Sequence, residues 1–171
     1  MITIVPRGDA GGFTAFLPQD DRNFVSKKWM QIELVSLLGG RAAEATFLDD
    51  ITTGASNDIE RATNIARNMV MKYGMSEELG PIRFENEGDN VFLGNDLGQI
   101  HAYSDQTAEK IDREIRQLIQ RSYDRACQIL KENTELVNAL ADLLLKEETV
   151  RKDEFESLFQ EYGKIYDMEK E

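Results

Sequence analysis

Apolar side chains recur every three or four residues in the part of the chain that follows Ser104. This spacing is that of one face of an α-helix, so it predicts helices that must bury their apolar faces against one another. Three successive stripes share the pattern. They comprise Ile111, Ile115, Leu118, Ile119, Ala126, Ile129 and Leu130, then Leu136, Val137, Leu140, Leu143 and Leu144, and finally Phe155, Leu158 and Phe159. The pattern predicts a fold made mostly of antiparallel helices.

Two further helices are predicted before Ser104. Ser26 has the side chain of an N-cap, and apolar residues at helical spacing follow it until Gly39–Gly40 interrupts the pattern. Asn57 can cap the next helix, because Glu60 stands three residues later as in a capping box. Gly74 ends that helix.

The start of the chain is extended in character. Ile2–Val5 and 12–17 read as two short strands joined by a glycine-rich loop. No internal repeat, low-complexity segment or linker divides the sequence. We therefore expect a mainly α fold over residues 1–171, a single helical domain with a small β element near the N-terminus.

Composition excludes several classes of function. The chain has 20 basic and 32 acidic residues and a net charge of −12, which disfavours nucleic acid or anionic lipid as a ligand. Cys127 is the only cysteine, so the chain holds no internal disulfide, and a reducing compartment is expected. No apolar run is long enough to suggest a membrane span, and the start lacks the apolar stretch of a signal peptide.

Most catalytic constellations are absent from the sequence. His101 is the only histidine, so two histidines of one chain cannot share a metal, and no serine has a suitable base. There is no Gly-x-x-x-x-Gly-Lys-Ser/Thr loop to bind the phosphates of a nucleotide. We interpret His101 as a partly exposed residue before a helix.

One segment, Thr52–Thr63, gathers small, polar and acidic residues around a helix start. Within it, Asp58 is a candidate metal ligand. An acidic residue is also common in a first helical turn, because the helix dipole favours it there. Residue chemistry alone leaves both interpretations open.

The same segment resembles the sequence that supplies the third zinc ligand in FtsH-type ATP-dependent zinc metalloproteases. The resemblance keeps its order and spacing over nearly the whole chain. It is carried on either side by Ile4–Gly8, Gly12–Pro18, Leu37–Glu44, Ala66–Val70, Gly74–Pro81, Val91–Gly94, Ser104–Ala108 and Ile111–Asp112.

The resemblance implies roles for three parts of the sequence. Asp58 would be the third zinc ligand. Glu44 would orient a ligating histidine from the second shell, although a solvent-facing glutamate paired with Arg41 is an equal alternative. An edge strand would bind substrate peptide through its main chain, or would be an ordinary half-buried strand. It comprises Gly12, Phe13, Thr14, Ala15 and Phe16.

The sequence departs from the family pattern at its start. The family places a His-Glu-x-x-His helix, with two zinc ligands and the general base, before the first strand. Met1 stands after that point, so we expect a truncated peptidase domain that has no catalytic residue, retains no zinc and is inactive alone. The zinc, and the ATP and Mg of an ATPase domain, would belong to the longer parent protein.

The resemblance also implies partners and a location for the parent. It would be a homo-hexamer that degrades unfolded or membrane proteins in protein quality control. It would lie at the cytoplasmic face of a membrane, or the organelle equivalent, anchored through segments outside this chain, and would bind no nucleic acid. Two alternatives remain. One is a catalytically inactive helical interaction or scaffold paralogue, and the other is an acidic helical adaptor unrelated to proteases.

Overall fold

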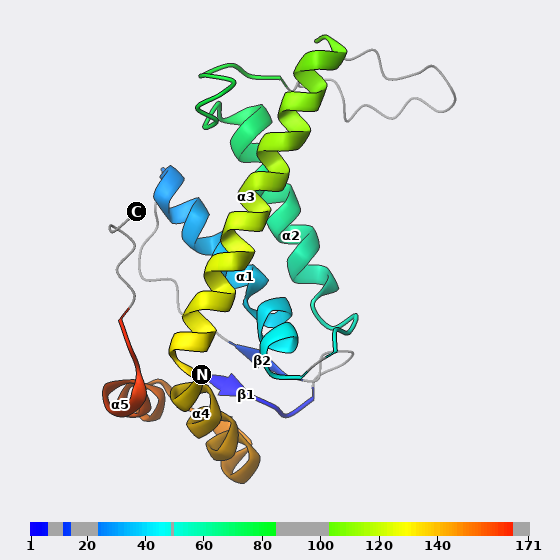
Figure 1. Cartoon of the computed structure of the whole chain (residues 1–171). Coiled ribbons are helices and arrows are strands. Elements are labelled where there is room, and N and C mark those ends of the chain that lie inside the picture. Colours follow the sequence, from blue (N-terminus) through cyan, green and yellow to red (C-terminus); the bar gives the residue numbers. More distant parts are fainter. Residues whose placement is uncertain (7–11, 15–23, 49, 85–102, 166–171) are drawn as a thin grey trace. The chain divides into compact units, whose positions relative to one another are not determined.

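A computed structural model describes residues 1–6, 12–14, 24–48, 50–84 and 103–165 (Figure 1). The described chain is mainly α-helical, as predicted. It contains β1 Ile2–Thr3, β2 Phe13–Thr14, α1 Lys27–Phe47, α2 Ser56–Arg67, the π-helix η1 Asn68–Lys72, α3 Asp105–Glu132, α4 Thr134–Glu147, β3 Thr149–Val150 and α5 Lys152–Tyr162. These elements form two units, residues 24–127 and residues 1–23 with 128–171.

The core of the unit 24–127 lies where α1, α2 and η1 meet. Leu34 of α1, Ala62 and Ala66 of α2, and Met69 of η1 are completely buried. Because Ala62 and Ala66 are small, their face of α2 can pack closely against the larger side chains of α1. The first predicted stripe packs against this core through Ile115, Leu118 and Ile119 of α3.

Helix α1 begins as predicted and then differs from the prediction. The hydroxyl of Ser26 accepts a hydrogen bond from the Trp29 N–H at 3.1 Å and so caps the helix. Gly39–Gly40 does not interrupt it, because one continuous helix runs from Lys27 to Phe47. Each glycine costs about 1 kcal/mol of helix propensity. The buried neighbours Leu38 and Ala42 keep the helix intact through packing.

Gly74 ends the next helical segment, which confirms the prediction. Its φ of 59° lies in the left-handed region, and an added Cβ would come within 2.9 Å of the Pro81 Cα. Before it, α2 widens into the π-helix η1, where the Tyr73 N–H donates to the Asn68 carbonyl at 2.9 Å. The sequence did not predict this wider turn, because the apolar spacing of one π turn resembles that of an α-helix.

The other unit contains a three-stranded antiparallel sheet in the order β2-β1-β3. Ile2 is opposite Thr14 on one side and Val150 on the other. The third strand was not predicted, since the sequence was read as helical nearly to its end. Glu148, with a φ of 58°, ends α4 in the left-handed conformation and turns the chain into β3.

Buried polar residues of this unit have partners. The Thr3 hydroxyl donates to the Glu148 carbonyl at 3.0 Å. Asn133, between α3 and α4, donates from its amide to the Ile129 carbonyl at 2.9 Å and accepts the Lys164 N–H at 2.6 Å. Asn133 therefore connects the end of α3 to the segment that follows α5.

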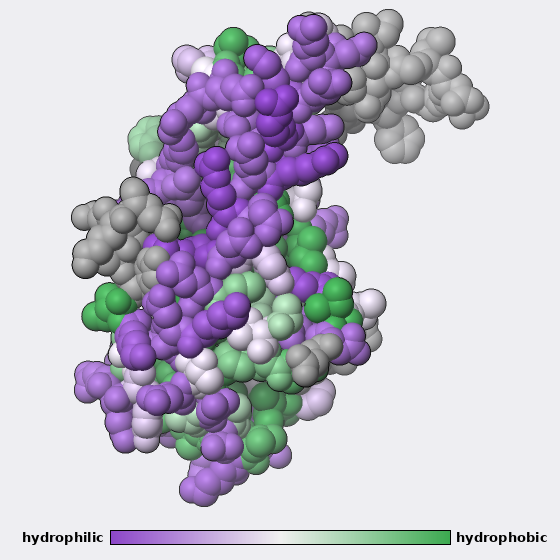
Figure 2. Space-filling view, viewed as in Figure 1, coloured by the Kyte–Doolittle hydropathy of each residue, from purple (hydrophilic) through white to green (hydrophobic). Residues whose placement is uncertain are grey.

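Helix α3 shows a hydrophilic face in Figure 2, in line with the many charged residues along it. Among the described residues, none of the helices is at once long and apolar enough for a membrane span.

Candidate functional site

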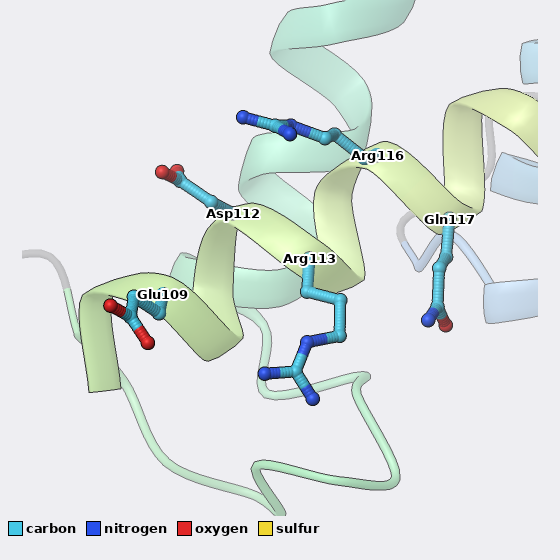
Figure 3. A pocket seen from close by; sticks show the side chains of 5 residues that line it. All are labelled: Glu109, Asp112, Arg113, Arg116 and Gln117. Carbon is cyan, nitrogen blue, oxygen red and sulfur yellow. The ribbon is translucent and has the colours of Figure 1, made fainter. Parts of the chain in front are cut away.

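The described residues form two surface hollows that neither Asp58 nor Glu44 lines. One lies along α3, where two acidic side chains and two arginines line it, so it favours neither sign of charge (Figure 3). The other lies between Thr63 of α2 and residues of α3. The candidate site is therefore built from Asp58 and the loop that leads to it.

Helix α2 starts earlier than the sequence predicted. Its N-cap is Ala55, which makes no side-chain capping bond, and Asn57 lies within the first turn. The predicted capping box of Asn57 and Glu60 is therefore wrong. The Ser56 N–H donates to the Thr53 carbonyl at 3.0 Å, so the chain is already turning before Asn57.

Asp58 occupies the third position of α2, in its first turn. Its side chain is 48% exposed, and its carboxylate lies 3.4 Å from the guanidinium of Arg61. Arg61 also forms an ion pair of 3.6 Å with Glu33 of α1. Since Arg61 is itself largely exposed, the pair is weak, and the Asp58 carboxylate remains accessible to a ligand.

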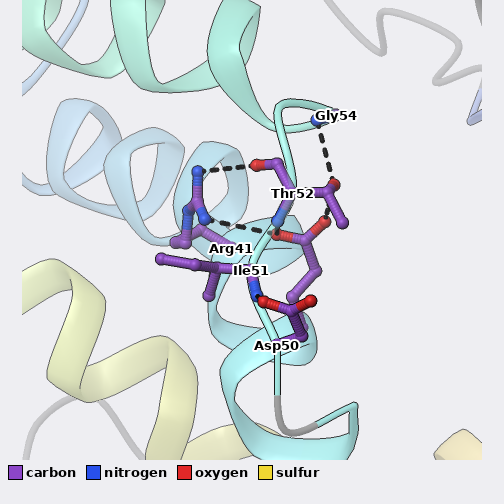
Figure 4. A network of polar contacts seen from close by, with 6 residues as sticks. Arg41, Asp50, Ile51, Thr52 and Gly54 are labelled. Atoms are coloured by element: carbon purple, nitrogen blue, oxygen red, sulfur yellow. Dashed lines mark hydrogen bonds and ion pairs between the residues drawn. The ribbon is translucent and has the colours of Figure 1, made fainter.

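Glu44 is the centre of a polar network that joins α1 to the loop before α2. Figure 4 shows this network with Arg41, Thr52 and Gly54 labelled. One carboxylate oxygen accepts the Thr52 hydroxyl, and the other accepts the Thr52 N–H at 3.3 Å. The Thr52 hydroxyl oxygen in turn accepts the Gly54 N–H at 3.1 Å. We call Arg41, Glu44, Thr52 and Gly54 the loop latch.

Arg41 completes the latch from the same face of α1. Its guanidinium donates to the Thr52 carbonyl at 3.0 Å and lies 3.5 Å from Glu44. The nitrogen that faces Glu44 is buried and has no hydrogen-bond acceptor among the described residues. Among the described residues, this nitrogen forms an ion pair with the Glu44 carboxylate.

The pKa of Glu44 is lowered from its ordinary value. The hydrogen bond from the Thr52 hydroxyl is the largest cause, followed by that from the Thr52 N–H. Partial burial opposes the shift, and the charge of Arg41 adds to it. Glu44 is therefore ionised at neutral pH and serves the latch as an acceptor.

The pairing of Glu44 with Arg41, part of one interpretation of the sequence, is present, but Glu44 does not face solvent, since its side chain is only 16% exposed. The other, in which Glu44 orients a ligating histidine, stays a prediction. Sequence reasoning missed the role of Thr52, which was read only as part of a loop. A contact between Glu44 and Thr52 depends on how the chain returns after α1, and no periodicity in the sequence records that.

The predicted substrate strand is described in part. Phe13 and Thr14 form β2, at an edge of the sheet, whereas Ala15 and Phe16 lie outside the described residues, as does His101. A Cβ on Gly12 would lie 2.5 Å from the Thr3 carbonyl oxygen, so the approach of the chain to β1 requires glycine there. β2 and Asp58 belong to different units, and their predicted closeness stays a prediction.

The described residues hold no cluster of three His, Cys, Asp or Glu side chains that could bind a metal by itself. Asp58 is thus one potential ligand of a site that needs further donors. The carboxylate suits zinc, which accepts oxygen from Asp together with nitrogen from His.

Comparison of the sequence with known proteins identifies a family. Peptidase family M41 matches residues 1–158. The chain is 52% identical over 158 residues to ATP-dependent zinc metalloprotease FtsH 1 of Thermoanaerobacter sp. (strain X514), covering 92% of this chain and 26% of that protein. It is 48% identical over 158 residues to the ATP-dependent zinc metalloprotease FtsH of Bacillus subtilis (strain 168), covering 92% and 25%.

A third relative is the ATP-dependent zinc metalloprotease FtsH of Thermotoga maritima, 44% identical over 161 residues, covering 94% of this chain and 26% of that protein. The chain thus spans about a quarter of the length of these relatives. The match to the family extends over most of the chain and includes the loop latch and Asp58. The chain belongs to peptidase family M41.

Proposed function

We propose that this chain is part of an ATP-dependent zinc metalloendopeptidase, in which Asp58 supplies one protein ligand of the zinc. The observation that carries the proposal is the half-exposed Asp58 carboxylate in the first turn of α2, paired only with the exposed Arg61 among the described residues. The names of the relatives support the dependence on zinc and ATP.

The donor chemistry of Asp58 fits zinc. A catalytic zinc site takes three protein ligands and keeps a fourth position for water or substrate. Because the chain has one histidine, two histidines of a segment outside it would complete a His/His/Asp set. When bound, zinc supplies Lewis-acid activation of a water molecule and of the peptide carbonyl.

The chain's own residues would have three tasks in this protein. Asp58 would hold the metal and contribute one negative charge to the site. Glu44 would support the metal site, either by orienting a ligating histidine, as the resemblance implies, or through the loop that leads to Asp58. The strand from Gly12 to Phe16 would bind unfolded peptide by main-chain pairing, which is tolerant of sequence.

The remaining properties concern the longer protein. We propose a homo-hexamer whose separate ATPase domain, with ATP and Mg, feeds unfolded or membrane proteins to the peptidase. It would be held at the cytoplasmic face of a membrane, or the organelle equivalent, by segments outside this chain. The 171-residue chain alone would lack peptidase activity and would not retain zinc.

Degradation of an unfolded casein substrate tests the proposal. The full-length protein should degrade it in the presence of ATP, and a chelator should stop the reaction, whereas the 171-residue chain with added zinc should not. Chelator-sensitive activity that purifies with the 171-residue chain would contradict the proposal that the zinc site needs ligands from outside this chain. A folded full-length protein that shows no ATP-dependent proteolysis would favour the inactive scaffold paralogue.

A further inference from the structure

The first turn of α2 lacks the side-chain cap that usually fixes a helix start. Ala55 stands at the N-cap and makes no side-chain bond. An uncapped start is less stable than one capped by Ser, Thr, Asp or Asn. Asp58, three residues later, therefore depends on something else for a fixed position.

The loop latch provides a connection from the core to this turn. Arg41 and Glu44 stand three residues apart on α1, beside the completely buried Ala42. From this rigid base they bind Thr52 at its hydroxyl, its N–H and its carbonyl. A short loop with three of its polar groups held in this way has little freedom left.

Hydrogen bonds continue from Thr52 to the helix. The Gly54 N–H donates to the Thr52 hydroxyl oxygen at 3.1 Å, and the Ser56 N–H donates to the Thr53 carbonyl at 3.0 Å. The Ile59 N–H then donates to the carbonyl of the buried Ala55 at 3.0 Å. Asp58 lies within this last turn.

We propose that Arg41, Glu44 and Thr52 are positioning residues for Asp58, acting through the loop 52–55 on the start of α2. The proposal rests on the proposed function of Asp58. It assigns to Glu44 a role that needs no contact with a metal ligand, because the carboxylate already accepts two hydrogen bonds from Thr52 and pairs with Arg41.

The substitution Thr52→Val tests the latch, because it removes the hydroxyl and keeps the branched shape. Thr52→Ser keeps the hydroxyl. Thr53→Val is the matched control, since the exposed Thr53 side chain makes no hydrogen bond with the described residues. The readout is amide hydrogen exchange in the 171-residue chain.

We expect exchange at Gly54, Ser56 and Ile59 to rise at least about fivefold in Thr52→Val, because the variant loses the hydroxyl's bond to Glu44 and the bond from the Gly54 N–H, and one lost hydrogen bond already gives about that change. Core amides of α1 should be unaffected, and Thr52→Ser and Thr53→Val should resemble the original chain. Unchanged exchange in Thr52→Val would overturn the proposal. If that variant does not fold, Arg41→Met removes the donor to the Thr52 carbonyl and should accelerate the same amides.

Zinc affinity in the full-length protein separates the latch from direct action of Glu44 on a ligand. By chelator competition, Thr52→Val and Glu44→Gln should each weaken zinc binding about tenfold, and the double variant should be no weaker than Glu44→Gln. A loss in Glu44→Gln alone would show that Glu44 acts directly and would overturn the proposal. If Asp58→Asn leaves zinc binding intact, the proposed function fails, while the exchange results still decide the latch.

Discussion

Glu44, near the end of α1, accepts hydrogen bonds from both the main-chain N–H and the hydroxyl of Thr52, eight residues further along the chain. The two bonds commit both carboxylate oxygens to one residue of the loop before α2. Together with Arg41, they attach that loop to a helix whose other face is buried in the core. The protein therefore has an electrostatic contact whose strength depends on pH.

The stability contributed by Glu44 should depend on pH. Its folded pKa is lowered, so the folded state binds the proton less well than the unfolded state does. The contribution is therefore present above the ordinary glutamate pKa and is lost as the pH falls through the folded value. In urea unfolding, the original chain should be more stable than Glu44→Gln at neutral pH, and the difference should shrink from about pH 5 downwards.

Glu60→Gln is the control for this experiment, because Glu60 is exposed on α2 and makes no ion pair with the described residues. Its stability relative to the original chain should not show this trend. A difference between Glu44→Gln and the original chain that stays constant from neutral to acidic pH would show that the charge of Glu44 does not stabilise the loop.

The core of the unit 24–127 makes a second prediction. Leu34 is completely buried among α1, α2 and η1, so Leu34→Ala should lower the free energy of unfolding by about 2–5 kcal/mol. Leu48→Ala should change it by no more than about 0.5 kcal/mol, since Leu48 is 65% exposed. Urea unfolding followed by circular dichroism measures both. Equal effects, or a melt without cooperativity, would mean that this core does not hold the unit together.

The sequence predicted the helical content because a helix that buries one face must carry apolar residues every three or four positions. The stripe on α3 packs where its spacing required, and Ser26 caps α1 by its side chain as expected. The elements that were missed are short or depend on distant contacts. β3 has two residues, too few to show alternation, and it exists because β1 pairs with it across the length of the chain.

The sequence predicted the candidate ligand Asp58, but it did not predict the residues that hold the loop before α2. Asp58 stands in a first helical turn, as expected from its neighbours. Asn57 was the wrong cap, because the latch and the Thr53 carbonyl start the turn before it is reached. Neither Arg41 nor Thr52 has a sequence signature as a loop anchor. Their contact arises only once α1 has packed and the chain has turned back.

The edge strand makes a prediction about substrate. In the full-length protein, Thr14→Pro should reduce degradation of both short peptides and unfolded proteins, because proline removes a main-chain donor and obstructs pairing with peptide. Zinc content should stay unchanged. Thr14→Val keeps the main-chain N–H and serves as the control, and a thermal melt of both variants shows whether the sheet itself is intact. Normal cleavage by Thr14→Pro would show that β2 does not bind substrate peptide and has only a structural role.

The most direct test of the account is the zinc content of the full-length protein carrying Asp58→Asn. The amide is a neutral and weaker ligand, whereas asparagine is tolerated at the start of a helix. Asp112→Asn, at an exposed position of α3, is the control. Metal analysis after gel filtration should find zinc in the original protein and in the control, and little in Asp58→Asn, with ATP hydrolysis retained in all three. Full zinc occupancy and unchanged proteolysis in Asp58→Asn would remove Asp58 from the metal site.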